Sequence, residues 1–145
     1  MQRIKQLQPL SMEHHLSLSL AARSIKVANA GKQDEIKQLC EQIVDEYETV
    51  WRRHFDNEEQ AIFIPYSPRD KEIKKLCDQL TLEHQKFDAF IKQMKSGHYE
   101  VLLDFGKLLK SHTRLEEREL FPLISELLSE TELDNIYQII KNSVD

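Results

Sequence analysis

Two copies of one motif, His-x-x-x-Glu, lie 58 positions apart in this chain. The first copy joins His54 to Glu58 and the second joins His112 to Glu116; in both, a second Glu, an apolar residue and a Phe follow at the same offsets. Residues i and i+4 of a helix lie one turn apart on one face, so each copy directs an imidazole and a carboxylate toward the same point. We therefore expect both copies on helices, where each forms half of a metal site.

The composition favours a nearly all-helical chain. Only three Gly and four Pro occur in 145 residues, and no stretch alternates apolar and polar residues for long. With 40% apolar residues, the chain is large enough to bury one core, and we predict a single domain over residues 1–145.

Gly, Pro and capping residues predict where the helices begin and end. Five helices are expected: about 11–30, about 33–62, one opened by Ser67-Pro68 and closed at Ser96-Gly97, one that follows at once and is kinked or ended by Pro122, and a shorter one from the capping box at Ser129 to about Lys141. Gly31 and Pro65 are expected to end the first two. Connections this short make neighbouring helices antiparallel. The predicted fold is an all-α, up-down-up-down four-helix bundle with a short C-terminal fifth helix.

Each of the four long helices has an apolar stripe that is interrupted by one His. These residues are His14, His54, His84 and His112. On the first helix the stripe predicts an inward face made of Leu7, Leu10, His14, Leu18, Ala21, Ile25 and Ala28. Cys40 and Cys77 fall on such stripes without Cys-x-x-Cys spacing, so we interpret both as small core residues.

The two carboxylates of the repeated motif also fall on inward stripes. A single His in an apolar stripe is usually a packed core residue, but burying ionised Glu58 and Glu116 without partners costs several kcal/mol. No Lys or Arg lies on the stripes to neutralise them. A metal cation would do so. The structural alternative is that both Glu side chains reach the end of the bundle or stay protonated.

Four imidazoles and two carboxylates from four helices form a natural dinuclear donor set. The predicted metal ligands are His14, His54, Glu58, His84, His112 and Glu116. We expect two His for each metal, with the two Glu as bridges. Nitrogen and oxygen donors without thiolates suit Fe or Mn and, less well, Zn. The expected cofactor is a pair of non-haem, carboxylate-bridged iron ions.

The chain resembles the hemerythrin-like, or HHE cation-binding, family from about Leu10 to Lys141. The family pattern is a His on the first helix, His-x-x-x-Glu on the second, a His on the third and His-x-x-x-Glu on the fourth, often continued by Glu-x-x-Leu-Phe-Pro. The matching residues here are Glu13-His14, His54 to Glu58, Glu83-His84, and His112 to Glu116 followed by Glu117-Arg118-Glu119-Leu120-Phe121-Pro122. The resemblance implies a helix bundle that holds a di-iron site.

Two positions depart from the oxygen-carrying hemerythrins, which have five His. Asp88 stands four residues after His84, where those proteins have another His, and we predict that it either approaches one metal or orients a bound water. Their acid on the fourth helix corresponds to Glu117, whereas Glu116 fits the HHE pattern. Glu59 and Glu117 are expected at the edge of the bundle, with replacement of the neighbouring ligand as the alternative. His15 points about 100° away from His14 and is expected to flank the site or to support a ligand rather than to bind the metal.

We predict a non-haem di-iron protein that binds or senses dioxygen, peroxide or nitric oxide, or that holds iron itself. One alternative is a di-iron oxidative or iron-donating enzyme that resembles iron–sulfur cluster repair proteins. Another is a bundle that the metal only stabilises. The sequence favours a protein that binds metal and gas over an enzyme, because it contains no nucleotide loop and no Ser or Cys nucleophile beside a His.

The charge pattern predicts neither a nucleic acid nor a membrane as partner. The net charge is −5, and no basic cluster with interleaved aromatic residues is present in the sequence. No apolar run approaches the roughly 20 residues that span a bilayer. The first residues lack the apolar core of a signal peptide, so the expected location is the cytoplasm.

Overall fold

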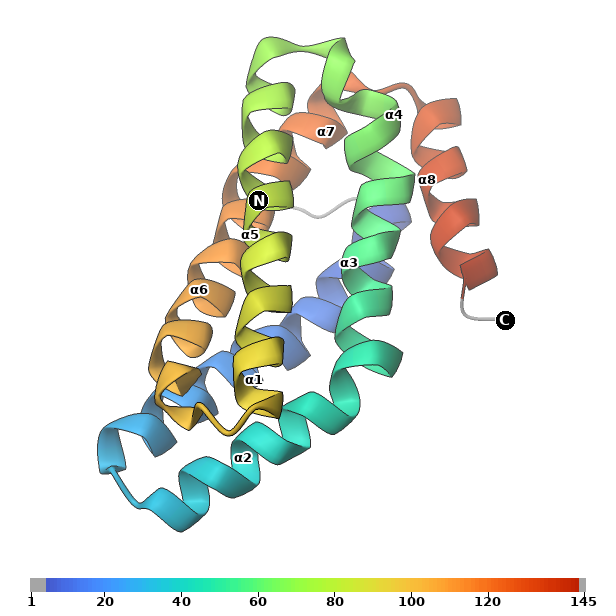
Figure 1. Cartoon of the computed structure of the whole chain (residues 1–145). Helices are drawn as coiled ribbons and strands as arrows, with labels where there is room; N and C mark the ends of the chain where they lie inside the picture. Colours follow the sequence, from blue (N-terminus) through green and yellow to red (C-terminus); the bar gives the residue numbers. More distant parts are fainter. Residues whose placement is uncertain (1–4, 144–145) are drawn as a thin grey trace.

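The structure, a computed structural model, describes residues 5–143, and these are helical apart from short connections. The α-helices (labels as in Figure 1) are α1 (Gln8–Ala30), α2 (Gln33–Glu46), α3 (Arg52–Glu58), α4 (Ile64–Tyr66), α5 (Lys71–Lys95), α6 (Leu102–Leu115), α7 (Phe121–Leu127) and α8 (Glu130–Ser143). Turns of 3-10 helix span Lys5–Leu7, Ser67–Arg69 and Tyr99–Val101, and π-helical turns span Tyr47–Trp51, Glu59–Phe63 and Glu116–Leu120. The prediction of an all-α chain is confirmed.

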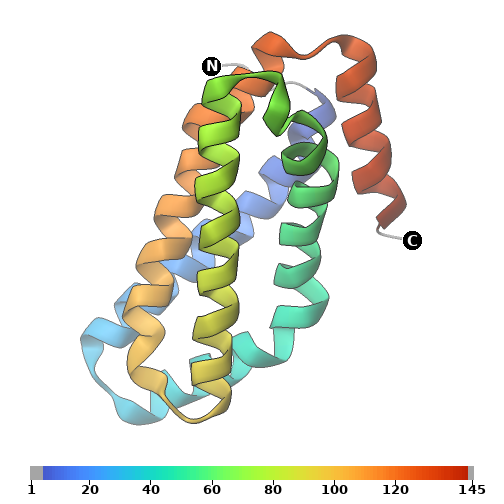
Figure 2. The same cartoon turned by 45° about the horizontal axis from the view of Figure 1, so that its top comes forward.

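Four long helical segments lie side by side and alternate in direction (Figures 1 and 2). They are α1, α2 to α4, α5, and α6 to α7. Helix α1 packs along α6, α5 lies against both α2 and α6, and α2 contacts α1. The last helix, α8, turns back beside α3 and packs against residues 5–7 and 59–63. The four long segments therefore enclose a common interior.

Two Pro residues lie within helical segments. The α-helical structure around Pro65 ends one residue later, at Tyr66, close to the predicted end. Past Pro122 the helix continues to Leu127, so of the two predicted alternatives an end at Pro122 is wrong and a kink stays a prediction. A Pro ring clashes with the carbonyl four residues earlier in an α-helix, which here belongs to Ala61 or Arg118. Both carbonyls lie within π-helical turns, whose wider hydrogen-bond pattern takes these positions out of the α-helical ladder. The π-helical turns thus accommodate both Pro residues within helical segments.

Helix caps agree with the sequence at three of four ends, because α5 also ends at Lys95, directly before the predicted Ser96-Gly97. Gly31 ends α1 with φ 73°, and Ser129 and Glu132 form the predicted capping box, with reciprocal bonds of 2.9 and 3.2 Å. The predicted N-cap at Ser67 is wrong, because that residue begins a 3-10 turn. Asp70 caps α5 instead: its Oδ2 accepts from the backbone N–H groups of the second and third helical residues, at 2.9 and 3.2 Å.

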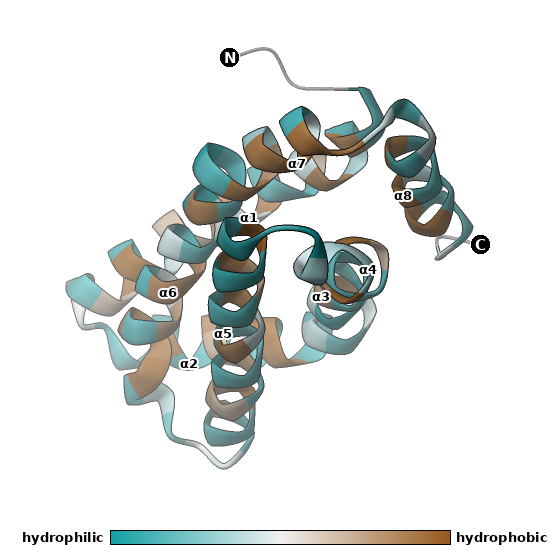
Figure 3. Cartoon of the chain, turned by 90° about the horizontal axis from the view of Figure 1, so that it is seen from above, coloured by the Kyte–Doolittle hydropathy of each residue, from teal (hydrophilic) through white to brown (hydrophobic). Residues whose placement is uncertain are grey.

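The predicted metal ligands separate two apolar clusters of the core. On α1, Leu10 belongs to one cluster and Ala21 to the other, with His14 between them, and α5 shows the same order around His84. Figure 3 shows hydrophobic residues mainly on the sides of the helices that face one another. Among residues 5–143, no helix combines the length and the apolar character that crossing a membrane requires.

The inward face of α1 differs from the prediction. Buried there are Ser11, Ser17, Leu20 and Ser24, whereas Leu18, Ile25 and Ala28 are only half-buried. The cause is close packing on α6, where a Cβ atom added at Gly106 would lie 2.9 Å from Cβ of Ser24 and 3.1 Å from the carbonyl oxygen of Ala21. Only small residues fit between helices that approach so closely, so the buried face turns toward the Ser side chains.

Candidate metal centre

The six predicted ligands meet in the layer between the two apolar clusters. They are His14 on α1, His54 and Glu58 on α3, His84 on α5, His112 on α6, and Glu116 in the π-helical turn after α6. All six are at most 5% exposed. Their donor atoms form two groups that share Glu58, namely His14, His54, Glu58 and Glu116, and Glu58, His84 and His112; within each group the atoms lie within 4.8 Å of one another. The structure thus brings all six side chains into one site.

Glu58 lies at the centre of the site. Its Oε2 atom is 3.3 Å from Nε2 of His14 and 3.2 Å from Nε2 of His54. Its Oε1 atom is 3.1 Å from Nε2 of His84 and 3.8 Å from Nε2 of His112. One carboxylate therefore faces all four imidazoles, with one oxygen toward each pair.

Glu116 faces one imidazole of each pair. Its Oε1 atom is 3.2 Å from Nε2 of His14 and 3.4 Å from Nε2 of His112. Within residues 5–143, neither oxygen of Glu116 nor Nε2 of His112 has a partner that meets hydrogen-bond geometry. Buried polar atoms almost always have such a partner, and the unsatisfied ones here point into the cluster. Glu58 and Glu116 are called the inner carboxylates below.

Each imidazole contacts a further carboxylate through its other ring nitrogen, Nδ1. The four pairs are His14 with Glu117 (2.9 Å), His54 with Glu13 (3.0 Å), His84 with Glu59 (2.7 Å) and His112 with Glu83 (2.8 Å). We call Glu13, Glu59, Glu83 and Glu117 the outer carboxylates. Each pair joins neighbouring helical segments, and together they form a closed cycle from α1 to α3, α5, α6 and back to α1.

Glu13 and Glu83 match the family pattern in the sequence, but no role was predicted for them, and Glu59 and Glu117 were expected at the bundle edge. The available signal was adjacency, since each outer Glu directly precedes or follows a predicted ligand in the sequence. Consecutive helical residues point about 100° apart, so a residue beside an inward ligand faces the neighbouring helix. Glu59 and Glu117 therefore bond imidazoles and leave Glu58 and Glu116 as the inner pair.

Carboxylates on both sides of each ring constrain its protonation. An ionised carboxylate only accepts hydrogen bonds, and a neutral imidazole has a single N–H. When Nδ1–H donates to the outer carboxylate, the lone pair of Nε2 points at oxygens of the inner carboxylates, which repel it. A second proton on the ring or a metal cation in the centre removes this repulsion. The donor set therefore fits a cation at each pair of imidazoles.

Protons stabilise the cluster when no metal is bound. Burial lowers the pKa values of His54 and His112, but the surrounding carboxylates outweigh burial and raise them to about 9 and about 10. Burial raises the pKa of Glu58, yet the charge of His54 and hydrogen bonds within the cluster hold it well below the ordinary value. Burial and repulsion from Glu58 raise the pKa of Glu116. The two inner carboxylates thus have unlike electrostatic environments.

Asp88 bonds to groups outside the cluster. Its Oδ1 atom accepts hydrogen bonds from the hydroxyl of Tyr47 (2.5 Å) and from the guanidinium of Arg52 (2.9 Å). It is not one of the grouped donors, so the structure does not support the first predicted alternative, an approach to one metal. The second alternative, orientation of a bound water, stays a prediction. His15 is exposed, which places it outside the site as predicted.

Aromatic rings cover the imidazoles on the apolar sides of the layer. Phe55 and Phe63 stack on His84 with centroid distances of 4.3 and 5.6 Å, and Phe121 stacks on His14 at 5.4 Å. Such rings keep water away from the nitrogen and oxygen donors and lower the local dielectric. The donors therefore lie in a polar layer with apolar walls.

The chain matches a protein-family model over most of its length. A model of the hemerythrin HHE cation-binding domain matches residues 7–124, a range that contains all six clustered side chains. Comparisons with curated proteins and with solved structures give no match.

Proposed function

The chain belongs to the hemerythrin HHE cation-binding family, and on this premise we propose that it is a non-haem di-iron protein that binds or senses a small ligand. The ligand is dioxygen, peroxide or nitric oxide, or the protein holds iron itself. The proposal places the site in a single domain built as an up-down-up-down four-helix bundle, with α8 as the short fifth helix. We propose a cytoplasmic location for the protein.

The observation that carries this proposal is the position of every imidazole between two carboxylates. Six carboxylates and four imidazoles meet in one layer. Among the described residues, no Lys or Arg side chain pairs with the inner carboxylates. Such an arrangement is costly unless positive charge is present. Two divalent or trivalent cations would offset most or all of the negative charge.

The contacts support two metals rather than one. His14 and His54 would hold one metal, and His84 and His112 the other, because each pair faces a different oxygen of Glu58. Glu116 approaches one imidazole of each pair and would serve as a second bridge. These are the six ligands expected from the sequence.

Iron suits this donor set best. Imidazole and carboxylate donors without thiolate favour Fe or Mn, with Zn as a further candidate. When bound, an iron pair would supply reversible redox chemistry and an exchangeable coordination position. The protein itself contributes the outer carboxylates, which orient each ring, and the aromatic walls around the donors. Asp88 is held by Tyr47 and Arg52, which supports two His donors for each metal.

The test is an optical spectrum of iron-reconstituted protein, reduced under nitrogen and then exposed to dioxygen or to nitric oxide. We expect a new visible charge-transfer band with at least one of the two gases. His14→Ala should abolish the band, whereas His15→Ala, a change of the exposed neighbour, should preserve it. A silent spectrum with both gases, from protein that retains its iron, would leave the iron as a structural element only.

A further inference from the structure

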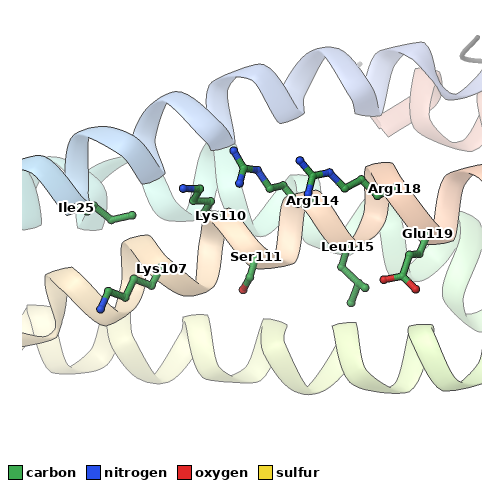
Figure 4. A pocket seen from close by; sticks show the side chains of 8 residues that line it. All are labelled: Ile25, Lys107, Lys110, Ser111, Arg114, Leu115, Arg118 and Glu119. Carbon is green, nitrogen blue, oxygen red and sulfur yellow. The ribbon is translucent and has the colours of Figure 1, made fainter. Parts of the chain in front are cut away.

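A groove of about 590 Å³ runs along the outer side of α6. Figure 4 shows its lining, which comes from α6, the π-helical turn after it, and α1. The lining residues are Ile25, Lys107, Lys110, Ser111, Arg114, Leu115, Arg118 and Glu119. None of them belongs to the metal centre, although Ser111 and Leu115 directly precede His112 and Glu116 in the sequence. The groove is therefore a separate surface on the helix that carries two of the proposed ligands.

Cations form a row on successive turns of this helix. Lys110, Arg114 and Arg118 extend to one side of α6 in Figure 4, and Lys107 precedes them by one turn on the other side. All four are exposed, and none makes an ion pair with another residue in the range 5–143. Like charges spaced four residues apart destabilise a helix by a few tenths of a kcal/mol per pair. Lys110, Arg114 and Arg118 therefore repel one another along the row.

The second row of the groove is mixed in character. Lys107, Ser111, Leu115 and Glu119 lie on the side of α6 opposite the cationic row in Figure 4. Leu115 and Ile25 are half-buried and give the groove an apolar part. Glu119 places a negative charge at the end of the groove where Arg118 ends the cationic row. The two ends of the groove therefore differ in charge, which would give a charged partner one preferred orientation along the helix.

We propose that this groove docks a partner protein through an acidic amphipathic helix. Carboxylates of the partner on successive turns would face Lys110, Arg114 and Arg118, and an apolar side chain would rest on Leu115 and Ile25. A partner cation would face Glu119. Successive turns of any helix repeat every 5.4 Å, so acidic residues spaced like the cationic row would match it in register.

The same features favour a protein over a nucleic acid. A phosphate backbone offers no apolar group for Leu115 and Ile25 and no cation for Glu119, whereas an amphipathic helix can supply both. Opposite charges at the rim of a protein interface mainly set specificity and association rate, and screening by salt weakens them. Binding of an acidic helix should therefore weaken at high ionic strength.

The probe is a synthetic helical peptide with Glu on three successive turns, one Leu between them and one Lys after the last Glu. Its affinity is measured by fluorescence anisotropy on the metal-loaded protein. The double variant Lys110→Glu, Arg114→Glu should weaken binding by about tenfold or more, a loss of about 1.4 kcal/mol. The control Lys37→Glu, Lys75→Glu makes the same charge change at exposed positions elsewhere and should change affinity less than about twofold. The neutral double variant Lys110→Gln, Arg114→Gln is used if the first does not fold.

The orientation of the bound peptide along the groove is tested by exchanging one charge on the protein and one on the peptide. Glu119→Lys should weaken binding of the first peptide and restore binding of a peptide whose Lys is replaced by Glu. Equal weakening by the groove variant and the control variant would overturn the proposal. So would tighter binding of a single-stranded oligonucleotide through the same cations, or light scattering that shows a dimer of this chain lost in the groove variant. Each of the last two results would assign the groove to a different occupant.

Discussion

Nδ1 of His112 lies 2.8 Å from a carboxylate oxygen of Glu83, although the two residues belong to different helices. His112 lies on α6 and Glu83 on α5, where it directly precedes His84. The contact fixes the orientation of the His112 ring, so its Nε2 atom points at the inner carboxylates. The other three imidazoles make the same contact between Nδ1 and an outer carboxylate. The outer carboxylates therefore orient all four imidazole rings.

Removal of an outer carboxylate should weaken metal binding without removing a ligand. Glu83→Ala deletes the acceptor for Nδ1 of His112 and should lower metal affinity by about 10- to 100-fold. Glu83→Gln keeps an acceptor and should have a smaller effect. The measurement is a competition titration with a chelator, and Glu72→Ala, at an exposed position of the same helix, is the control. Equal affinities for wild type and Glu83→Ala would contradict the assigned role.

The two inner carboxylates should respond differently to neutralisation in the metal-free protein. Glu58 faces all four imidazoles, and Glu58→Gln should destabilise the metal-free protein by about 3–5 kcal/mol, since buried imidazolium groups lose their partner. Glu116 is disfavoured as an anion by burial and by Glu58. Glu116→Gln should therefore be neutral or stabilising. Denaturant unfolding of both variants after chelation measures the difference, and equal losses would refute it.

Metal uptake should release protons at neutral pH. The folded-state pKa values of His54 and His112, about 9 and about 10, lie above the unfolded value of about 6.5. Their contribution to the stability of the metal-free protein is therefore fully present below about pH 6.5 and is lost as pH rises through 9 to 10. Metal must displace these protons, so affinity should increase with pH. Calorimetry in buffers of different ionisation enthalpy counts the released protons. Stability of the metal-free protein that rises over this window would contradict the prediction.

The close approach of α1 and α6 should make Gly106 sensitive to a single methyl group. A Cβ atom there would meet Cβ of Ser24 at 2.9 Å and the carbonyl oxygen of Ala21 at 3.1 Å, and the carbonyl cannot move without its helix. We expect Gly106→Ala to destabilise the protein by about 1–3 kcal/mol, although Ala is the better helix former. Thermal unfolding measures this loss, with Ala89→Gly at an exposed site of α5 as the control for helix propensity. A Gly106→Ala variant as stable as wild type would show that the helices can separate at little cost.

The sequence was sufficient to predict that the imidazoles and the inner carboxylates point into the same interior, because helical spacing determines this. His54 and Glu58, like His112 and Glu116, lie one turn apart on a single helix, so their common direction follows from local geometry. The outer carboxylates depend on which helix lies beside which, and this information is tertiary. Asp88 illustrates the same point, because Tyr47 and Arg52, which hold it, come from another segment of the chain.

Packing density and π-helical turns account for the remaining errors. At the close contact with Gly106, Ser24 is fully buried, whereas Ile25 stays half-buried although its Cγ1 atom would lie 3.0 Å from a Cβ at Gly106. Hydrophobicity alone predicts that Ile25 is buried and Ser24 is exposed. The extension of the helix past Pro122 depends on the π-helical turn before it, for which the sequence carries no simple signal.

The central claim, a dinuclear site, is tested most directly by the metal content of the protein after anaerobic reconstitution with ferrous iron and removal of excess metal. Elemental analysis should give about two iron ions per chain, because two pairs of imidazoles face opposite oxygens of Glu58. His84→Ala, which removes a donor from one pair only, should lower this ratio, and His15→Ala should leave it unchanged. One tightly held zinc ion per chain, with no second metal taken up from iron, would contradict the account.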